Sequence, residues 1–242
     1  MIALLCSVQA EAQLLFADLV VTGTTKLGSK SIIAGTLADQ QVLLCVGGMG
    51  KVNAAHAAAL MIAEFSPDTL LIFGVGGAYP ASGAAVGDIV LAQVEIAGDE
   101  GVLTHDGFKD MEYIGIPLLK TATSVIFTTY PASEPLLKQA LHTLITSSER
   151  GRSSVHSGPF VTLSTCTGTA ARARELEERY HGLCENMEGA AAAQVAGLHA
   201  IPWLEVRGIS NIVEDRDTQK WDIPRAAEAC QKAVMRILEG WK

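Results

Sequence analysis

Short apolar runs alternate with segments of helical periodicity along most of the chain. The runs occupy residues 2–8, 42–47, 69–75, 88–96, 154–163 and 202–209, and the helical segments occupy 10–19, 51–65, 132–148, 168–181, 187–198 and 223–240. Strands that are apolar throughout, rather than at every second position, are typical of a sheet covered on both faces. The pattern therefore predicts an α/β fold with a central sheet between helices.

The length and composition fit one domain of this class. The chain has 242 residues, of which 49% are hydrophobic and 18% are charged. Chains of this size often form one α/β domain, so we expect residues 1–242 to form a single domain. Residues 97–131 have weak periodicity and should leave the sheet as a long excursion, a type of segment that often carries binding residues.

Charge and cysteine usage limit the partners and the compartment. The formal net charge is −8 and the basic residues do not cluster, which argues against nucleic acid as a partner. The N-terminal apolar run is interrupted at Gln9 and Glu11, so it predicts a strand and neither a signal peptide nor a membrane span. Five widely spaced cysteines without a C-x-x-C pair favour reduced thiols and a cytoplasmic location. The histidines lack ligand-type spacing, so no metal site is expected.

Two glycine-rich segments, "CVGGMGKVNAA" and "LIFGVGGAYPASGAAVGD", directly follow hydrophobic strands. Glycine at such a position lets the backbone approach a ligand, which makes Gly76 and Gly77 candidate substrate-binding residues. Tyr79 stands where a dinucleotide-binding motif needs its third glycine, and Lys51 is followed by valine rather than by the Ser or Thr of a phosphate loop. No cofactor is therefore predicted, and tight turns alone would also explain these glycines.

Glu188 lies in "ENMEGAAAA", a stretch with too few polar residues to be a solvated helix face. Its carboxylate should be at least partly buried, and a buried charge needs partners. One candidate partner is an internal arginine, Arg207, which would give Glu188 a structural role. The other is a ligand with two hydroxyl groups, such as a ribose 2′,3′-diol, because an ionised carboxylate has two acceptor oxygens and no donor.

Further polar residues follow predicted strands at the edge where parallel sheets bind ligands. Glu11 follows the first strand, although a first-turn helix acid would explain it as well. Arg207, Ser210 and Asn211 follow the strand near the C-terminus. The amide of Asn211 can donate and accept together, whereas a plain Asx-turn is the alternative.

The segments "GVGGAYPASGAAVGDIVLA", "GPFVTLSTCTGT", "ENMEGAAAAQVA" and "LEVRGISNIVEDRD" resemble the nucleoside phosphorylase and nucleosidase superfamily over nearly the whole chain. The resemblance implies a single α/β domain with a central mixed, partly barrel-like sheet flanked by helices. It also implies an active site at the strand ends that is often completed by a neighbouring subunit, so a homo-oligomer is expected. "GDEGV" and "GFKDMEYIGIP" are most similar to a branch that releases hypoxanthine from a nucleoside with a benzoate tail, in menaquinone biosynthesis.

The same resemblance implies roles for individual residues. Glu11 matches the position that orients or deprotonates the attacking water, and Met187 with Glu188 matches the ribose-binding pair. Asn211 matches the position that faces the purine N7 and the substituent at the purine six-position. The wall that stacks against the base and bonds to it matches three consecutive residues: Phe160, Val161 and Thr162.

Two departures from the wider superfamily refine the expected activity. Nucleosidases that release adenine usually have aspartate where Asn211 stands, so asparagine favours a 6-oxopurine leaving group. Phosphorylases hold phosphate with arginines near the glycine turns, where this chain has none, and Glu11 would repel a phosphate dianion. Hydrolysis of the N-ribosidic bond is therefore expected.

The sequence leaves three alternatives open: a purine nucleoside phosphorylase, a nucleosidase of the methylthioadenosine/adenosylhomocysteine type, and a non-catalytic nucleoside-binding protein. The donor for the benzoate tail is not identified by any motif. Three basic residues are weak candidates for it: His105, Lys109 and Arg152.

Overall fold

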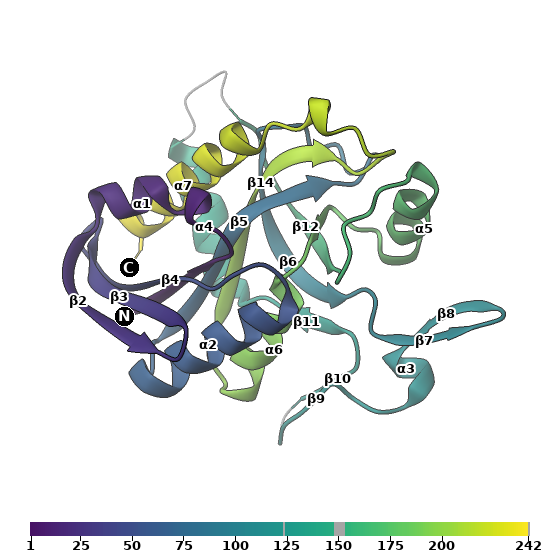
Figure 1. Cartoon of the computed structure of the whole chain (residues 1–242), viewed down its shortest axis with the longest axis horizontal. Helices are drawn as coiled ribbons and strands as arrows, with labels where there is room; N and C mark the ends of the chain where they lie inside the picture. The colour runs from purple at the N-terminus through teal and green to yellow at the C-terminus, as the bar shows by residue number, and fades with distance from the viewer. Residues whose placement is uncertain (123, 148–152, 242) are drawn as a thin grey trace.

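The apolar runs form the strands of one mixed sheet (Figure 1). The computed structural model describes residues 1–122, 124–147 and 153–241. Within these residues ten strands make up the sheet: β1 (Ile2–Cys6), β2 (Val20–Leu27), β3 (Lys30–Leu37), β4 (Gln40–Val46), β5 (Thr69–Ala78), β6 (Ile89–Ala97), β11 (Thr129–Pro131), β12 (Val155–Thr162), β13 (Cys184–Asn186) and β14 (Trp203–Ile212).

Five of these strands close on themselves. β5 pairs with β14, β14 with β6, β6 with β12, β12 with β13, and β13 again with β5. The remaining strands continue from β5 through β1, β4 and β3 to the edge strand β2, and β11 pairs with β6. The expected mixed, partly barrel-like sheet is confirmed.

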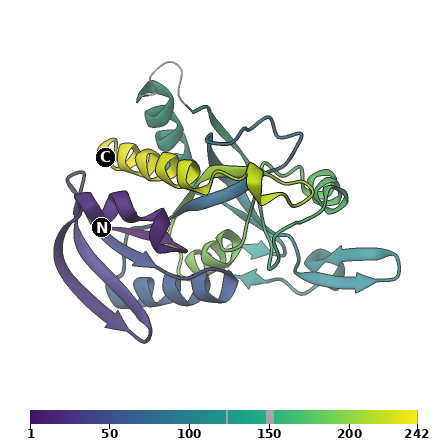
Figure 2. The same ribbon diagram turned by 45° about the horizontal axis from the view of Figure 1, so that its top comes forward.

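Helices cover both faces of the sheet, as Figures 1 and 2 show. They are α1 (Gln13–Asp18), α2 (Lys51–Phe65), α4 (Glu134–Ser147), α5 (Ala170–Tyr180), α6 (Gly189–Leu198) and α7 (Ile223–Glu239), with short 3-10 helices η1 (Gln9–Glu11) and η2 (Thr218–Lys220). α2 and α6 bury one apolar cluster against the sheet, and α1, α4 and α7 bury a second on the opposite face. None of the helices in the described ranges is both long and apolar enough to cross a membrane.

The predicted excursion projects from the body of the molecule in both views (Figures 1 and 2). Its hairpin is formed by β7 (Gly101–Thr104) and β8 (Gly107–Asp110), followed by α3 (Met111–Ile114), β9 (Leu119–Lys120) and β10 (Val125–Ile126). The chain then returns to the sheet through β11. We call this segment, residues 101–122 and 124–126, the projecting arm.

Each predicted apolar run and helical segment corresponds to an element of the structure, with shifted ends. The ends shift by up to three residues, and the predicted helix 10–19 starts as the 3-10 helix η1 and becomes α1 only at Gln13. The hairpin of β2 and β3 has no counterpart in the prediction. β2 is an exposed edge strand, so it lacks the apolar pattern from which the buried strands were recognised.

Candidate active site

A cavity of about 260 Å³ opens where parallel strands end. β1 is flanked by β4 and β5, β5 also pairs with β14, and all four run parallel, so the turns that follow them meet at one edge of the sheet. The lining residues come mainly from these turns and from the segment that enters α6: Ser7, Val8, Glu11, Met49, Val75, Gly76, Gly77, Cys166, Thr167, Glu185, Asn186, Met187, Glu188, Arg207, Ser210, Asn211, Val213, Trp221 and Ile223.

Glu11 is held by the backbone at the end of β1. Its Oε2 accepts hydrogen bonds from the amides of Ser7 and Val8, at 2.9 and 3.1 Å, and its Oε1 accepts one from Val75 at 2.9 Å. Gly74 makes this approach possible, since a Cβ at that position would lie 2.5 Å from Oε1 of Glu11. The carboxylate is 4% exposed and lines the cavity, so it is fixed in direction and accessible only from the cavity.

Glu188 is the N-cap residue of α6, but its side chain does not cap the helix. Oδ1 of Asn186 takes that role, accepting from the amides of Glu188 and Gly189 at 2.9 and 2.8 Å. The carboxylate of Glu188 is thereby left for other partners. Its Oε1 accepts from the amide of Gly50 at 2.8 Å, in the first glycine turn. Gly50 has φ of 91°, a conformation that favours glycine.

The second oxygen of Glu188 meets Arg207, whose Nη2 donates to it at 3.3 Å. Arg207 is 1% exposed; its Nε donates to Glu205 at 2.7 Å and its Nη1 to the carbonyl of Val75 at 3.0 Å. Burial alone would lower the pKa of Arg207, but the surrounding carboxylates, Glu205 first, raise it well above its ordinary value. The arginine that the sequence offered as a partner for Glu188 is therefore present, and Glu188 also lines the cavity that a ligand would enter.

Asn211 and Ser210 lie at the end of β14, opposite the glycines of β5. The hydroxyl of Ser210 donates to Oδ1 of Asn211 at 2.7 Å, and Nδ2 of Asn211 donates to the carbonyl of Ile212 at 3.1 Å. Ser210 is also 3.1 Å from the carbonyl of Gly76. These contacts orient the amide, and one hydrogen of its NH₂ group remains for a ligand.

Glu185 lines the same cavity and was not among the expected site residues. It is 8% exposed, and its oxygens accept from the amide and hydroxyl of Thr167, at 2.8 and 2.5 Å, and from the hydroxyl of Tyr79 at 3.3 Å. Burial raises the pKa of Glu185, and the bonds from Thr167 and Tyr79 oppose that shift. Nearby, the thiol of Cys166 lies 3.4 Å from the sulfur of Met187.

The three residues expected to wall the base are not among the residues that line the cavity. Phe160, Val161 and Thr162 are 0% exposed, at the C-terminal end of β12. The hydroxyl of Thr162 instead accepts from the amide of Ala190 in the first turn of α6 and donates to Glu95 at 2.6 Å. After β12, the residues that line the cavity are Cys166 and Thr167, a few positions further along the chain.

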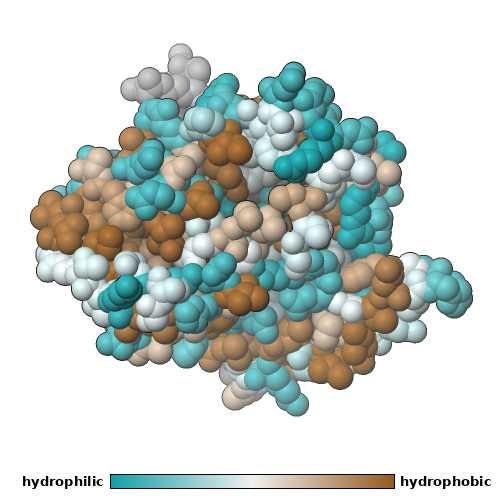
Figure 3. Space-filling model, viewed as in Figure 1, coloured by the Kyte–Doolittle hydropathy of each residue, from teal (hydrophilic) through white to brown (hydrophobic). Residues whose placement is uncertain are grey.

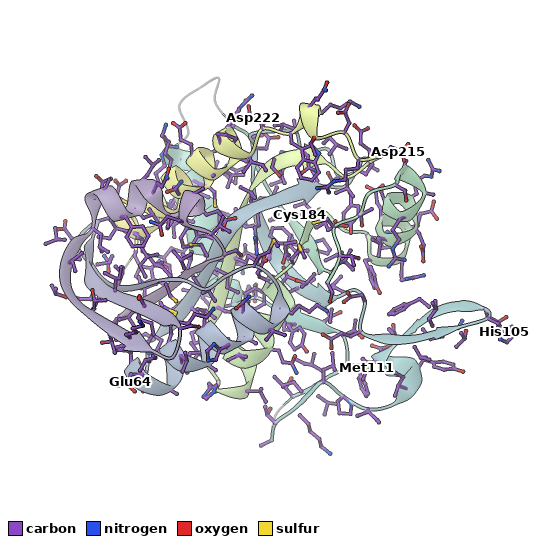
Figure 4. The ribbon with its side chains drawn as sticks, in the orientation of Figure 1. Glu64, His105, Met111, Cys184, Asp215 and Asp222 are labelled. Carbon is purple, nitrogen blue, oxygen red and sulfur yellow. The ribbon has the colours of Figure 1, made fainter. Side chains whose placement is uncertain are left out.

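Of the three basic residues considered for a benzoate tail, the two that the structure describes do not line the cavity. His105 lies at the tip of the β7–β8 hairpin, far from the central Cys184 (Figure 4), and Lys109 is on β8. Arg152 lies outside the described residues. Among the described residues that line the cavity, Arg207 is the one cationic residue, against three glutamates. In the described ranges, no group of three or more His, Cys, Asp or Glu side chains could hold a metal ion.

Several site residues had no recognisable signal in the sequence. Asn186 ends β13, Val213 follows β14, and Trp221 and Ile223 lie just before and at the start of α7, so only the tertiary fold brings them to the cavity. A signal did exist for Gly50, because the first glycine turn was expected to bring backbone to a ligand.

Comparison with known proteins places these features in a family. The family model described as the phosphorylase superfamily matches residues 1–239. A futalosine hydrolase from Streptomyces coelicolor is 34% identical over 208 residues, which cover 82% of this chain and 80% of that protein. A 5'-methylthioadenosine/S-adenosylhomocysteine nucleosidase from Maridesulfovibrio salexigens is 30% identical over 98% of both chains.

A solved structure has the same fold. The 5'-methylthioadenosine/S-adenosylhomocysteine nucleosidase of Neisseria meningitidis, in complex with methylthio-immucillin-A, superposes with a TM-score of 0.84. It is 23% identical to this chain and covers 98% of both chains. At that identity the likeness establishes the fold alone.

Proposed function

The chain belongs to the phosphorylase superfamily, and from that premise we propose that it hydrolyses the N-ribosidic bond of futalosine, releasing hypoxanthine and dehypoxanthine futalosine in menaquinone biosynthesis. The relatives named as futalosine hydrolases support the choice of substrate. In this proposal residues 1–242 act as one domain and need no cofactor.

One observation carries the choice of hydrolysis: the cavity brings Glu11 and Glu188 together, and the residues described in its lining offer no free cation. Arg207, the one cationic residue in the described lining, already donates to Glu188, Glu205 and a carbonyl group. A phosphate dianion needs fixed donors and compensating charge. Water is therefore the nucleophile that this cavity favours.

The proposed reaction passes through an oxocarbenium-like ribosyl state, as in glycosidases. Each oxygen of Glu188 has one protein partner, so each keeps a lone pair for a ribose hydroxyl. The negative charges of Glu188 and Glu11 stabilise the developing cation. Glu11, fixed by three backbone amides, positions the water and takes its proton as the new C1′–O bond forms.

Asn211 supports departure of the base. Its NH₂ group can donate to N7 as electrons move into the purine, and the bond from Ser210 fixes the orientation that this needs. We assign Gly76 and Gly77 to close backbone approach, Met187 to the ribose and Thr167 to the base. Thr167 takes the place that the sequence predicted for Phe160 and its two neighbours.

The tail of the substrate must extend out of the cavity. At about 260 Å³ the cavity is near the small end of ligand sites, which span about 300–1,000 Å³, so it suits the nucleoside part. The projecting arm exposes apolar residues, among them Leu103, Tyr113 and Ile116, at 81%, 67% and 63% (Figure 3). An exposed group of this kind supports a homo-oligomer, in which a neighbouring subunit completes the site. The five free cysteines support a cytoplasmic location.

A second candidate function is cleavage of methylthioadenosine or adenosylhomocysteine. The Maridesulfovibrio salexigens nucleosidase, identical at 30% over nearly full length, favours it. Asn211 argues against it, because release of adenine is helped by a carboxylic acid that protonates N7.

In the deciding experiment, the protein is incubated with futalosine, inosine or methylthioadenosine, each with and without phosphate. The released free base is followed by chromatography. Hypoxanthine release from futalosine without phosphate is the expected result. Release only with phosphate would identify a phosphorylase, adenine release alone would identify the second candidate, and binding without release would identify a nucleoside-binding protein.

A further inference from the structure

Two glutamates that the proposed reaction does not use directly are buried behind the ribose site. Glu95, on β6, and Glu205, on β14, are both 0% exposed. Glu95 accepts from the hydroxyl of Thr162 and from Nδ2 of Asn186, both at 2.6 Å. Glu205 accepts from Arg207 at 2.7 Å. Fully buried carboxylates are rare unless each is compensated, so these two require an explanation.

The two carboxyl groups face each other beneath the first residue of α6. A Cβ added to Gly189 would collide with both Oε1 of Glu95 and Oε2 of Glu205. With both groups ionised, no donor in the described part of the chain reaches Oε2 of Glu205. Two ionised carboxylates in contact would repel each other, and the buried Oε2 of Glu205 would lack a hydrogen-bond donor. Together these effects would be strongly destabilising. One proton between them removes both problems, because the protonated group donates to the other.

The surroundings identify which group holds the proton. Glu205 has a full positive charge beside it in Arg207, whereas Glu95 has only the neutral donors Thr162 and Asn186. Burial first, and then Glu205, raise the pKa of Glu95 well above its ordinary value. Burial raises the pKa of Glu205 too, but Arg207 and the bond from Glu95 oppose that shift. Glu95 is therefore the protonated member and Glu205 the ionised one.

The ionised member is connected to the cavity through one side chain. Arg207 donates to Glu205 through Nε and to Glu188 through Nη2, and the first bond is the shorter, at 2.7 against 3.3 Å. Glu205 thus takes the larger share of the charge of Arg207. Glu188 is left with a longer, weaker contact, and more of its negative charge remains for a ligand.

We propose that Glu95 and Glu205 share one proton, and that the ionised Glu205 is a positioning residue that turns Arg207 away from Glu188 and keeps the Glu188 carboxylate charged and available to the ribose. The kinetic part of this proposal rests on the function proposed above. Glu205 touches no substrate and acts only through Arg207.

The shared proton is tested without any substrate. The infrared spectrum of the protein near neutral pH should contain the carbonyl band of a protonated carboxylic acid, shifted in heavy water. Glu95→Gln should abolish that band, and Glu175→Gln, on the exposed surface of α5, should leave it. Absence of the band from the unmodified protein, or its persistence in Glu95→Gln, would overturn the shared proton.

The positioning role is tested by kinetics on the nucleoside that the protein cleaves. In Glu205→Gln the charge of Arg207 is left to Glu188, so we expect KM to rise about tenfold and kcat/KM to fall by about 10–100-fold. Glu95→Gln keeps Glu205 ionised, so its kcat/KM should fall less than that of Glu205→Gln. Equal kcat/KM in Glu205→Gln and the unmodified protein would refute the role.

Failure of this inference differs from failure of the proposed function. If no nucleoside is cleaved, the proposed function fails, while the infrared band still reports on the pair. A crystal structure of Glu205→Gln then tests the positioning role, since the distance from Arg207 to Glu188 should shorten from 3.3 Å. An unchanged distance would contradict the role. If that variant does not fold, Glu205→Asp, which keeps the charge at longer reach, replaces it, and an unchanged distance from Arg207 to Glu188 there would contradict the role as well.

Discussion

Arg207 lies 3.3 Å from the carboxylate of Glu188, and both side chains are buried, yet the ion pair leaves Glu188 on the wall of the cavity. The sequence presented a structural role beside Arg207 and a ligand-binding role as alternatives for Glu188, and the structure is consistent with both at once. The arginine compensates part of the buried charge, and the remaining acceptor capacity of Glu188 faces the cavity. A carboxylate in an alanine-rich segment can therefore be stabilised by the fold and still bind a ligand.

Glu188→Gln should lower kcat/KM for the nucleoside by about 100-fold or more. The amide keeps one acceptor oxygen, but it lacks the charge that stabilises a ribosyl cation and one acceptor for the diol. Steady-state kinetics measures the effect, with Glu175→Gln as the control on the protein surface. A loss no larger than that of the control would exclude Glu188 as the ribose anchor.

Glu11→Gln should lower kcat by about 100-fold or more while KM changes little. Glu11 activates the water in the proposed reaction and does not hold the substrate, so its effect should appear in the chemical step. Single-turnover measurements of base release separate that step from binding. A rise in KM with an unchanged kcat would instead make Glu11 a substrate-binding residue.

The sequence predicted the site at the ends of the parallel strands, because apolar runs and the residues after them are local signals. Glu11, Arg207, Ser210 and Asn211 were found in this way and meet at one cavity. Phe160, Val161 and Thr162, which were predicted to wall the base, are buried in β12, because the point at which this strand leaves the core depends on its pairing with β13.

The pair of Glu95 and Glu205 had no local signal at all. Each glutamate lies inside a strand, 110 residues apart in sequence, and only the closure of β5, β6, β12, β13 and β14 into one barrel-like sheet brings them together. Contacts of this kind depend on strand register, which the pattern of one sequence does not determine.

Asn211→Asp should shift the preference toward adenine nucleosides. An aspartate can accept the bond from Ser210 as the amide oxygen does, and its protonated form can donate to N7 of a leaving adenine. The ratio of kcat/KM for methylthioadenosine to that for futalosine should rise by about tenfold or more. An unchanged ratio would show that this position does not select the base.

The contribution of Glu95 to the free energy of unfolding should decrease as the pH rises. Its pKa is raised well above the ordinary value of 4.5 in the folded protein, so the native state binds more protons than the unfolded state. The resulting contribution is complete below about pH 4.5 and is lost as the pH rises through the folded pKa. Urea denaturation at a series of pH values measures this effect. As the pH rises, the free energy of unfolding should fall more steeply in the unmodified protein than in Glu95→Gln. Parallel curves would contradict the assignment of the proton to Glu95.

Gly189→Ala should destabilise the fold by about 2 kcal/mol or more, because overpacking in a core typically costs about 1–3 kcal/mol and the displaced groups here are carboxyls that share a proton. The new methyl group would occupy the space in which Glu95 and Glu205 meet, at the start of α6. Gly23→Ala is the matched control, since a Cβ at Gly23 meets nothing within 4 Å. Thermal and urea unfolding of both variants measure the difference. The change at Gly189 should also weaken the infrared band of the protonated acid, because it separates the two carboxyl groups. Equal stability of the two variants, with the band retained, would show that the carboxyl groups do not meet beneath Gly189.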